Sequence, residues 1–110
     1  MRDNHVISVP AVLPHTRHAR HLYTIWTKVE RRDEHMHALQ EAGIGVAVNF
    51  RAIHLMEFYA KKYGYKLGDF PHAERIGAST ITLPLYPQLT DEAVYYIMTR
   101  LTVLLYQRIR

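Results

Sequence analysis

The sequence predicts an α+β domain of two layers, in which a small, mainly antiparallel three-stranded sheet is covered by helices. Strand-like and helix-like segments alternate along the 110 residues in the order strand, helix, strand, two helices, strand, helix. Hydrophobic residues make up 48% and charged residues 22%, which is the balance of a globular protein. The length suits one domain with one hydrophobic core.

Residues 1–20 are expected to form an extended lead-in, and the domain itself is expected to span residues 21–110. Pro10 and Pro14 interrupt the lead-in, which shows no helical period. In the segment HLYTIWTKV (21–29), successive side chains belong alternately to two sets, one for each face of a strand. The segment is also rich in aromatic and β-branched residues, so it predicts a strand. Because both sets contain apolar side chains, this strand is expected to be central in the sheet.

The next segment predicts a helix followed by a second strand. Asp33 is expected to cap the helix, Met36 and Leu39 to face inward, and Gly43 to end it. The segment IGVAVNF (44–50) is then expected to form the second strand, because it is apolar and rich in valine.

Two short helices are expected before the third strand. Residues 51–65 carry Ile53, Met56 and Tyr59 at helical spacing, which predicts a helix that lies against the sheet and stops at Gly64. Pro71 favours the first turn of a helix over residues 71–80.

The segment ITLPLYP (81–87) predicts the third strand, and Pro84 places it at an edge or marks its end. The last helix is expected to open at Thr90, Asp91 and Glu92, with Arg108 and Arg110 at its negative end. Its apolar residues recur at helical spacing. They are Val94, Ile97, Met98, Leu101, Leu104 and Leu105.

Composition excludes several classes of function. The chain has no cysteine, so a disulfide, a thiolate nucleophile and a cysteine-type zinc site are impossible. The net charge of +4 comes from basic residues spread along the chain, so a nucleic-acid partner is not expected. The N-terminus lacks the apolar core of a signal peptide, and no apolar run reaches the length of a membrane span. The expected location is the cytoplasm, with no membrane partner.

The stretch PHTRHARHLY (14–23) raises the possibility of a metal site, because His15, His18 and His21 recur at a spacing of three. No carboxylate lies within the stretch to complete or orient such a site, so solvated or hydrogen-bonded structural histidines are the favoured interpretation. No phosphate-binding glycine loop, serine elbow, HExxH motif or suitable pair of carboxylates is present either. The sequence therefore predicts no catalytic residue and no metal ligand in this chain.

Three stretches carry a family resemblance: HLYTIW, RDEHMHALQEAGIGVAVNFRAIHLMEFY and YGYKLGDFPHAERIGASTITLPLYPQLTDEAV. With their glycine turn, FPxAE, LPLYP and LTDE motifs in this order, the chain from His21 onward resembles the C-terminal small domain of the DegT/DnrJ/StrS family of pyridoxal-phosphate-dependent sugar aminotransferases. The resemblance implies fold type I, in which a large domain holds the cofactor and the small domain closes over the active site of a homodimer.

The resemblance also implies an activity for the parent enzyme. Such enzymes transfer an amino group, usually from glutamate, to a keto carbon of a nucleotide-linked sugar, for amino-sugar or cell-surface polysaccharide synthesis. The chain is expected to lack the large domain with its Schiff-base lysine. Its four lysines (Lys28, Lys61, Lys62 and Lys66) lie in polar surroundings, so it is expected to bind no pyridoxal phosphate and to be inactive alone.

The candidate substrate-binding residues are Asn49, Phe50, Arg51 and His54. They follow the end of the predicted second strand, where polar groups can face a ligand from a fixed edge. By resemblance, Asn49 stands where many relatives have a histidine, Phe50 matches an aromatic residue and His54 matches a second histidine. Arg51 is expected to pair with diphosphate or carboxylate oxygens, and Asn49 and His54 to hydrogen-bond sugar or phosphate.

Other interpretations remain open at this point. Arg51 can be a solvated charge, Phe50 a core residue and His54 a cap of the short helix. The whole chain can equally be a standalone binding or interaction module that keeps the fold without the chemistry. A histidine-rich metal binder is a third possibility.

Overall fold

The structure, a computed structural model, describes residues 7–106. Its sheet has three antiparallel strands in the order β1 (Ile7–Ser8), β2 (Tyr23–Thr27) and β3 (Thr80–Leu83). Ile25 of β2 is paired with Ile81 of β3, and both side chains are buried. The predicted fold class is confirmed, and so is the central position of the strand that follows His21.

One predicted strand is wrong. Residues 44–50 do not form a strand, and only Ala47 makes a bridge, exchanging two backbone hydrogen bonds with Thr82 at 3.2 and 2.8 Å. The third strand of the sheet is instead β1, from residues that the sequence assigns to the lead-in. The chain leaves the sheet edge after Ala47 because residues 51 and 52 lie directly against α3 (Pro71–Ser79) at Gly77.

The first helix begins differently from the prediction. A short 3₁₀ turn, η1 (Val29–Arg31), leads into α1 (Arg32–Glu41), so Asp33 lies inside the first turn and does not cap it. There the Asp33 carboxylate favours the positive end of the helix and pairs with Arg32. The helix ends as expected at Gly43, whose φ of +80° suits glycine.

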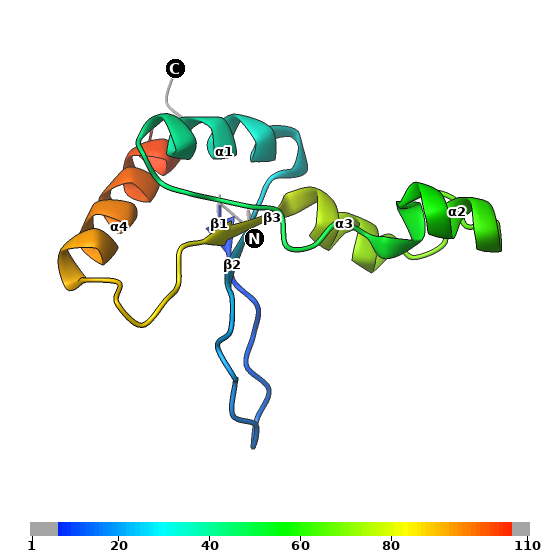
Figure 1. Cartoon of the computed structure of the whole chain (residues 1–110), viewed down its shortest axis with the longest axis horizontal. Coiled ribbons are helices and arrows are strands. Elements are labelled where there is room, and N and C mark those ends of the chain that lie inside the picture. Colours follow the sequence, from blue (N-terminus) through cyan, green and yellow to red (C-terminus); the bar gives the residue numbers. More distant parts are fainter. Residues whose placement is uncertain (1–6, 107–110) are drawn as a thin grey trace, which may run out of the picture.

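The predicted helix over residues 51–65 is divided and lies elsewhere. Extended backbone at Met56 separates η2 (Ile53–Leu55) from α2 (Glu57–Tyr63), and Gly64 ends α2 with a φ of +72°. Figure 1 shows α2 at the end of the molecule away from the sheet, with α3 between α2 and the sheet. Ile53, Met56 and Tyr59 are accordingly exposed, so the expectation that this helix lies against the sheet is wrong.

The last helix, α4 (Asp91–Tyr106), follows the prediction closely. Thr90 Oγ1 accepts the Ala93 N–H at 3.1 Å and so caps the helix. Ile97 is buried in the core, while Arg108 and Arg110 lie outside the described residues. No helix within residues 7–106 combines the length and the apolar character needed to cross a lipid bilayer.

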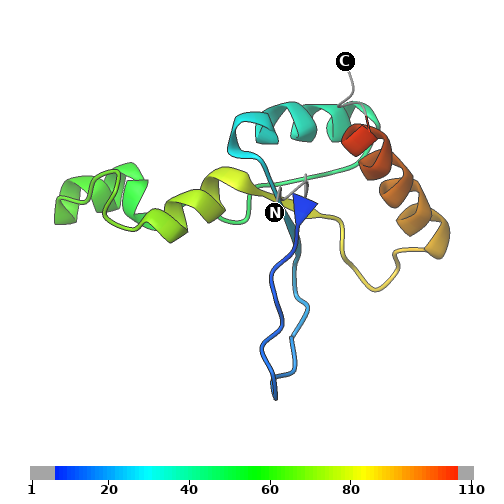
Figure 2. The same cartoon turned by 180° about the vertical axis from the view of Figure 1, so that it is seen from behind.

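The core lies where α1 and α4 meet the sheet, and Figure 2 shows these two helices together, at the end opposite α2. Its buried members are Ile25, Leu39, Ile44, Ile81, Leu83 and Ile97. Two parts extend from this body. One is an arm (residues 9–22) between β1 and β2, and the other is a side lobe (residues 50–76) made of η2, α2 and the first turns of α3.

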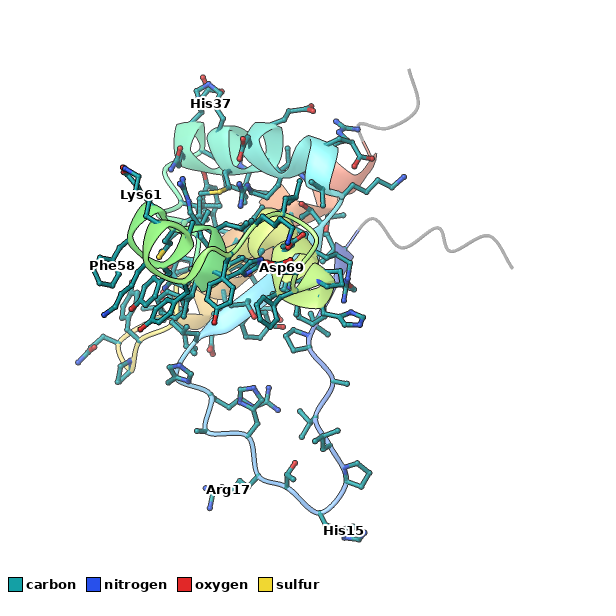
Figure 3. The ribbon with its side chains drawn as sticks, turned by 90° about the vertical axis from the view of Figure 1, so that its right-hand side faces the viewer. His15, Arg17, His37, Phe58, Lys61 and Asp69 are labelled. Carbon is teal, nitrogen blue, oxygen red and sulfur yellow. The ribbon has the colours of Figure 1, made fainter. Side chains whose placement is uncertain are left out.

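The arm carries the histidine-rich stretch. Its chain reverses at Pro14 and His15, and Figure 3 shows His15 and Arg17 at its tip, far from the side lobe. His18 Nδ1 accepts the Arg20 N–H at 2.8 Å, so one of these rings has a structural partner. In the part of the chain that the structure describes, no three histidine or acidic side chains are close enough to hold a metal ion.

A buried histidine lies in the core beside the sheet. His35 of α1 is 4% exposed, and its Nε2 atom has no hydrogen-bond partner among the described residues. The surrounding side chains include Ile25, Leu39 and Leu101. Burial lowers the pKa of His35, and the positive charge of Arg31 lowers it further, because both disfavour the imidazolium form.

We expect His35 to make the chain less stable in mild acid. The unfolded chain binds a proton at His35 near the ordinary pKa of 6.5, whereas the folded chain binds it only at lower pH. The free energy of unfolding should therefore fall as the pH drops from about 6.5 toward that lowered pKa. Urea unfolding at several pH values measures this fall, and His35→Leu should reduce it. His37→Gln, at an exposed position of the same helix, is the control, and equal pH slopes for His35→Leu and the wild type would contradict the assignment.

Candidate functional site

The side lobe has an open groove with a volume of about 700 Å³, here called the lobe groove. Residues 50–54 enter it from the sheet edge, and α2, the loop after it and α3 complete its walls. Its lining residues are Phe50, Arg51, Ala52, Ile53, His54, Tyr59, Tyr63, Tyr65, Phe70, Ala73 and Ile76.

The structure brings three of the four predicted site residues together at this groove. Phe50, Arg51 and His54 line it, whereas Asn49 is half-buried just before it and is not part of the lining. Phe50 is 66% exposed, which excludes the alternative of a core residue. Arg51 is exposed and has no carboxylate partner within 4 Å among the described residues. Its guanidinium group is therefore available to an anion.

The position of Arg51 depends on a close contact with α3. A Cβ atom placed on Gly77 would lie 2.6 Å from the Ala52 nitrogen and 3.3 Å from the Arg51 Cα. Only glycine lets the backbone of residues 51 and 52 approach the helix this closely. The glycine thus sets where Arg51 enters the lobe groove.

His54 is held by a carboxylate rather than exposed to solvent. Its ring is 6% exposed, and Nε2 lies 2.7 Å from Glu74 Oε1 of α3. The hydrogen bond from His54 holds the pKa of Glu74 below its ordinary value, and the N–H groups of Gly68 and Phe70 lower it further. Since the ionised carboxylate can only accept, His54 Nε2 carries the proton, and in the neutral ring Nδ1 is an acceptor. His54 makes no cap of η2, which excludes that alternative.

Aromatic rings continue from His54 along the groove. The His54 ring meets Phe70 edge-on at 4.9 Å between centroids, Phe70 meets Tyr65 at 5.5 Å, and Tyr65 meets Tyr63 at 5.7 Å. Neither these rings nor Glu74 is among the site residues predicted from the sequence. The YGY and FPHAE stretches can be read in the sequence. Their contacts with His54 form only because α3 folds back over η2, and the spacing of these stretches does not show that.

The lysines do not offer a place for a pyridoxal-phosphate Schiff base. Lys61 pairs with Glu57 and Lys66 with Asp69 on the surface, and Lys62 lies over exposed aromatic rings. Lys28 is half-buried at the end of β2. A lysine that forms a Schiff base lies in an enclosed pocket that excludes water. Lys61, Lys62 and Lys66 are exposed, so none of these three offers such a pocket to the cofactor.

Gly77→Ala should displace the groove backbone. Overlap with the Ala52 backbone should cost about 3 kcal/mol, the upper end for overpacking. The better helix propensity of alanine returns about 1 kcal/mol, so the variant should lose about 2 kcal/mol of unfolding free energy. Urea unfolding measures the loss. Gly45→Ala, whose added Cβ would meet nothing within 4 Å, is the matched control. Equal stability of the two variants would show that the close contact is not real.

Glu74→Ala should loosen the loop between α2 and α3, because one oxygen of Glu74 accepts N–H groups from Gly68 and Phe70 as well as from His54. We expect amide hydrogen exchange at Gly68 and Phe70 to become faster, while exchange in β2 and β3 is unchanged. Glu57→Ala removes an exposed carboxylate from the same lobe and is the control. Glu74→Gln keeps an acceptor oxygen and should restore part of the protection, whereas unchanged exchange in Glu74→Ala would exclude this role.

Comparisons with known proteins identify relatives of this chain in sequence and in fold. SpsC of Bacillus subtilis, a spore coat polysaccharide biosynthesis protein, is 39% identical over 90 residues, which are 77% of this chain and 23% of SpsC. DesV of S. venezuelae, solved in complex with a ketimine intermediate, superposes with a TM-score of 0.87 at 26% identity over 99% of this chain and 29% of DesV. NtdA of Bacillus subtilis, solved with bound PMP, gives 0.75 at 25% identity over 94% of this chain and 24% of NtdA.

The chain spans about a quarter of the length of these proteins. Residues 1–102 match the DegT/DnrJ/EryC1/StrS aminotransferase family, so the match includes the arm, the sheet and the side lobe. The sequence match and the fold lead to one assignment. This chain belongs to the DegT/DnrJ/EryC1/StrS aminotransferase family.

Proposed function

We propose that this chain is the small domain of a sugar aminotransferase that binds a keto nucleotide-sugar and receives its amino group from glutamate. The observation that carries the proposal is Arg51, an exposed guanidinium at the lobe groove with no acidic partner among the described residues. The polysaccharide role in the name of SpsC supports a sugar substrate. A planar guanidinium fork suits two oxygens of a diphosphate.

The other site residues take supporting roles in this proposal. Phe50, next to Arg51 and largely exposed, offers an apolar face to the substrate. His54 offers Nδ1 for a hydrogen bond to sugar or phosphate, because its Nε2 is bound to Glu74. Asn49, just outside the groove lining, hydrogen-bonds sugar or phosphate at its edge. All four bind and orient substrate, and none performs the chemistry.

The amino-transfer chemistry comes from pyridoxal phosphate on a lysine that this chain does not supply. The surface positions of Lys61, Lys62 and Lys66 support this part of the proposal. The chain alone is therefore inactive and works with a large domain, in an enzyme that is a homodimer.

An apolar groove at the other end of the sheet supports contact with a large domain. This sheet-end groove, of about 480 Å³, lies between the ends of β2 and β3 and the helix α4. Val94 and Met98, two members of the predicted apolar face of α4, are 38% and 57% exposed there. Apolar side chains that line one exposed groove together suit contact with another protein surface. We propose that the large domain covers it.

The proposal is tested by co-producing the chain with the large domain of a family member. Transfer is followed as 2-oxoglutarate released from glutamate in the presence of keto nucleotide-sugars. We expect transfer with both parts and none with the chain alone. Arg51→Gln should raise KM for the nucleotide-sugar about tenfold or more with little change in kcat, because it removes a charge-assisted hydrogen bond made equally before and during the reaction.

Arg100→Gln is the matched control, since Arg100 is an exposed arginine on α4 that lies over Tyr96 and away from the lobe groove. Its KM should equal that of the wild type. An unchanged KM in Arg51→Gln would refute the substrate role of Arg51. Binding of nucleotide-sugars without any transfer in the two-part enzyme would instead favour a binding module without chemistry.

A further inference from the structure

The outer side of α4 is poor in charge for an exposed helix. Figures 1 and 2 show α4 at the edge of the molecule, with α1 and the sheet on its inner side. After Asp91 and Glu92 in its first turn, its only charged residue is Arg100. A surface helix typically carries charged and polar side chains on the side away from the core, whereas a helix that is apolar all round is buried all round. The composition of α4 therefore indicates a second contact surface on its outer side.

The exposed side chains of that side form two ridges, here called the outer face. Side chains four residues apart lie one above the other on a helix, so each ridge repeats every four residues. One ridge consists of Glu92, Tyr96 and Arg100, and the other of Tyr95, Thr99 and Val103. All six are exposed, and Tyr95 is the most open of their apolar or aromatic members at 71%. None of the six lines the sheet-end groove, so the outer face is a separate surface.

Several polar groups of the outer face are already bound within the chain. Thr99 Oγ1 donates to the Tyr95 carbonyl oxygen at 2.8 Å, and the Tyr96 hydroxyl donates to the Ala42 carbonyl oxygen at 2.6 Å. The Arg100 guanidinium lies 5.3 Å from the centroid of the Tyr96 ring. These contacts order the side chains before a partner arrives, which lowers the entropic cost of association.

The two ends of the first ridge carry opposite charges. Glu92 and Arg100 lie two turns apart, about 12 Å along the helix axis, so they do not pair with each other. Neither has an oppositely charged side chain within 4 Å in the part of the chain that the structure describes. Tyr96 lies midway between them in sequence. If two copies of α4 cross antiparallel at Tyr96, Glu92 of each copy lies level with Arg100 of the other. The ridge is thus complementary to itself, as a two-fold contact requires.

We propose that the outer face of α4 binds the same face of a second copy of this chain, with the two helices antiparallel about a two-fold axis at Tyr96. Ridges of spacing four that interdigitate are the commonest class of helix packing in globular proteins. One face of a 16-residue helix buries less surface than a standard interface, so the contact is weak and reversible. It needs no large domain. Figure 1 shows α4 and the side lobe at opposite ends of the molecule, so the contact leaves the substrate residues free.

The test is sedimentation equilibrium of the 110-residue chain over a range of concentrations. We expect a monomer–dimer equilibrium. Tyr95→Lys brings two like charges together beside the two-fold axis and should weaken dimerisation about tenfold or more. Met98→Lys is the matched control, because Met98 is an exposed α4 residue that lines the sheet-end groove instead. This variant should dimerise like the wild type.

Reversed charges test the antiparallel pairing itself. Glu92→Arg and Arg100→Glu should each weaken dimerisation about tenfold or more, because each replaces both ion pairs by like charges. An equal mixture of the two variants should associate at least as well as the wild type, since each end of the mixed dimer again joins an arginine to a glutamate.

Three results would overturn the inference. The first is a chain that stays monomeric at every concentration. The second is a dimer that Met98→Lys abolishes and Tyr95→Lys does not, because the contact is then the sheet-end groove. The third is a mixture of the charge variants that associates no better than either variant alone. If the large domain covers the outer face instead, the chain alone is monomeric and Tyr95→Lys lowers transfer in the two-part enzyme, which also excludes a contact between copies.

Discussion

One carboxylate oxygen, Glu74 Oε1, holds the side lobe in place. It accepts Nε2–H of His54 from η2 and the N–H groups of Gly68 and Phe70 from the loop before α3. These donors lie on segments that share no sheet and no continuous helix, so the carboxylate substitutes for secondary structure. A negative charge with three donors is well compensated, and hydrogen bonds to a charged acceptor are the strong ones. The aromatic wall of the lobe groove depends on this arrangement.

The side lobe needs such a polar anchor because it has little core of its own. The helix α2 has no buried residue, and the buried cluster that stabilises the chain lies with α1, α4 and the sheet. The lobe is attached to this body through α3, at the contact between Gly77 and the backbone of residues 51 and 52. Arg51 is thus set by steric contact on one side and by the Glu74 hydrogen bonds on the other. Local opening of the lobe should cost less than unfolding of the body.

The sequence predicted those parts of the fold that depend on local pattern. The apolar spacing of α4, the glycine ends of α1 and α2 and the proline start of α3 follow from residues near one another in the chain. Distant contacts decided the third strand of the sheet, which the sequence pattern did not predict correctly. Residues 44–50 have the composition of a strand, yet only Ala47 pairs, since the chain turns toward Gly77. Ile7 and Ser8 carry no strong strand pattern, but they pair with the exposed edge of β2.

The site residues, too, divide into those that the sequence predicts from their neighbours in the chain and those that only distant contacts bring to the site. Phe50, Arg51 and His54 lie within five residues of one another in the sequence. Their common location could therefore be predicted, although the resemblance rather than any pattern assigned their roles. Glu74 and the rings after Gly64 could not be placed at the site, because only the return of α3 over η2 brings them there. A pattern of single residues cannot show that return.

The two grooves differ in chemistry, and this difference separates their roles. The sheet-end groove is lined almost entirely by aliphatic side chains and lies against α4, whereas the lobe groove combines aromatic rings with the exposed guanidinium of Arg51. Figure 1 shows α4 and the side lobe at opposite ends of the molecule. Aliphatic surface without charge offers area but little orientation, which suits a protein neighbour. Rings beside a cation fix the plane and the charge of a small ligand. The chemistry of the lobe groove thus suits a small ligand, and that of the sheet-end groove suits a protein neighbour.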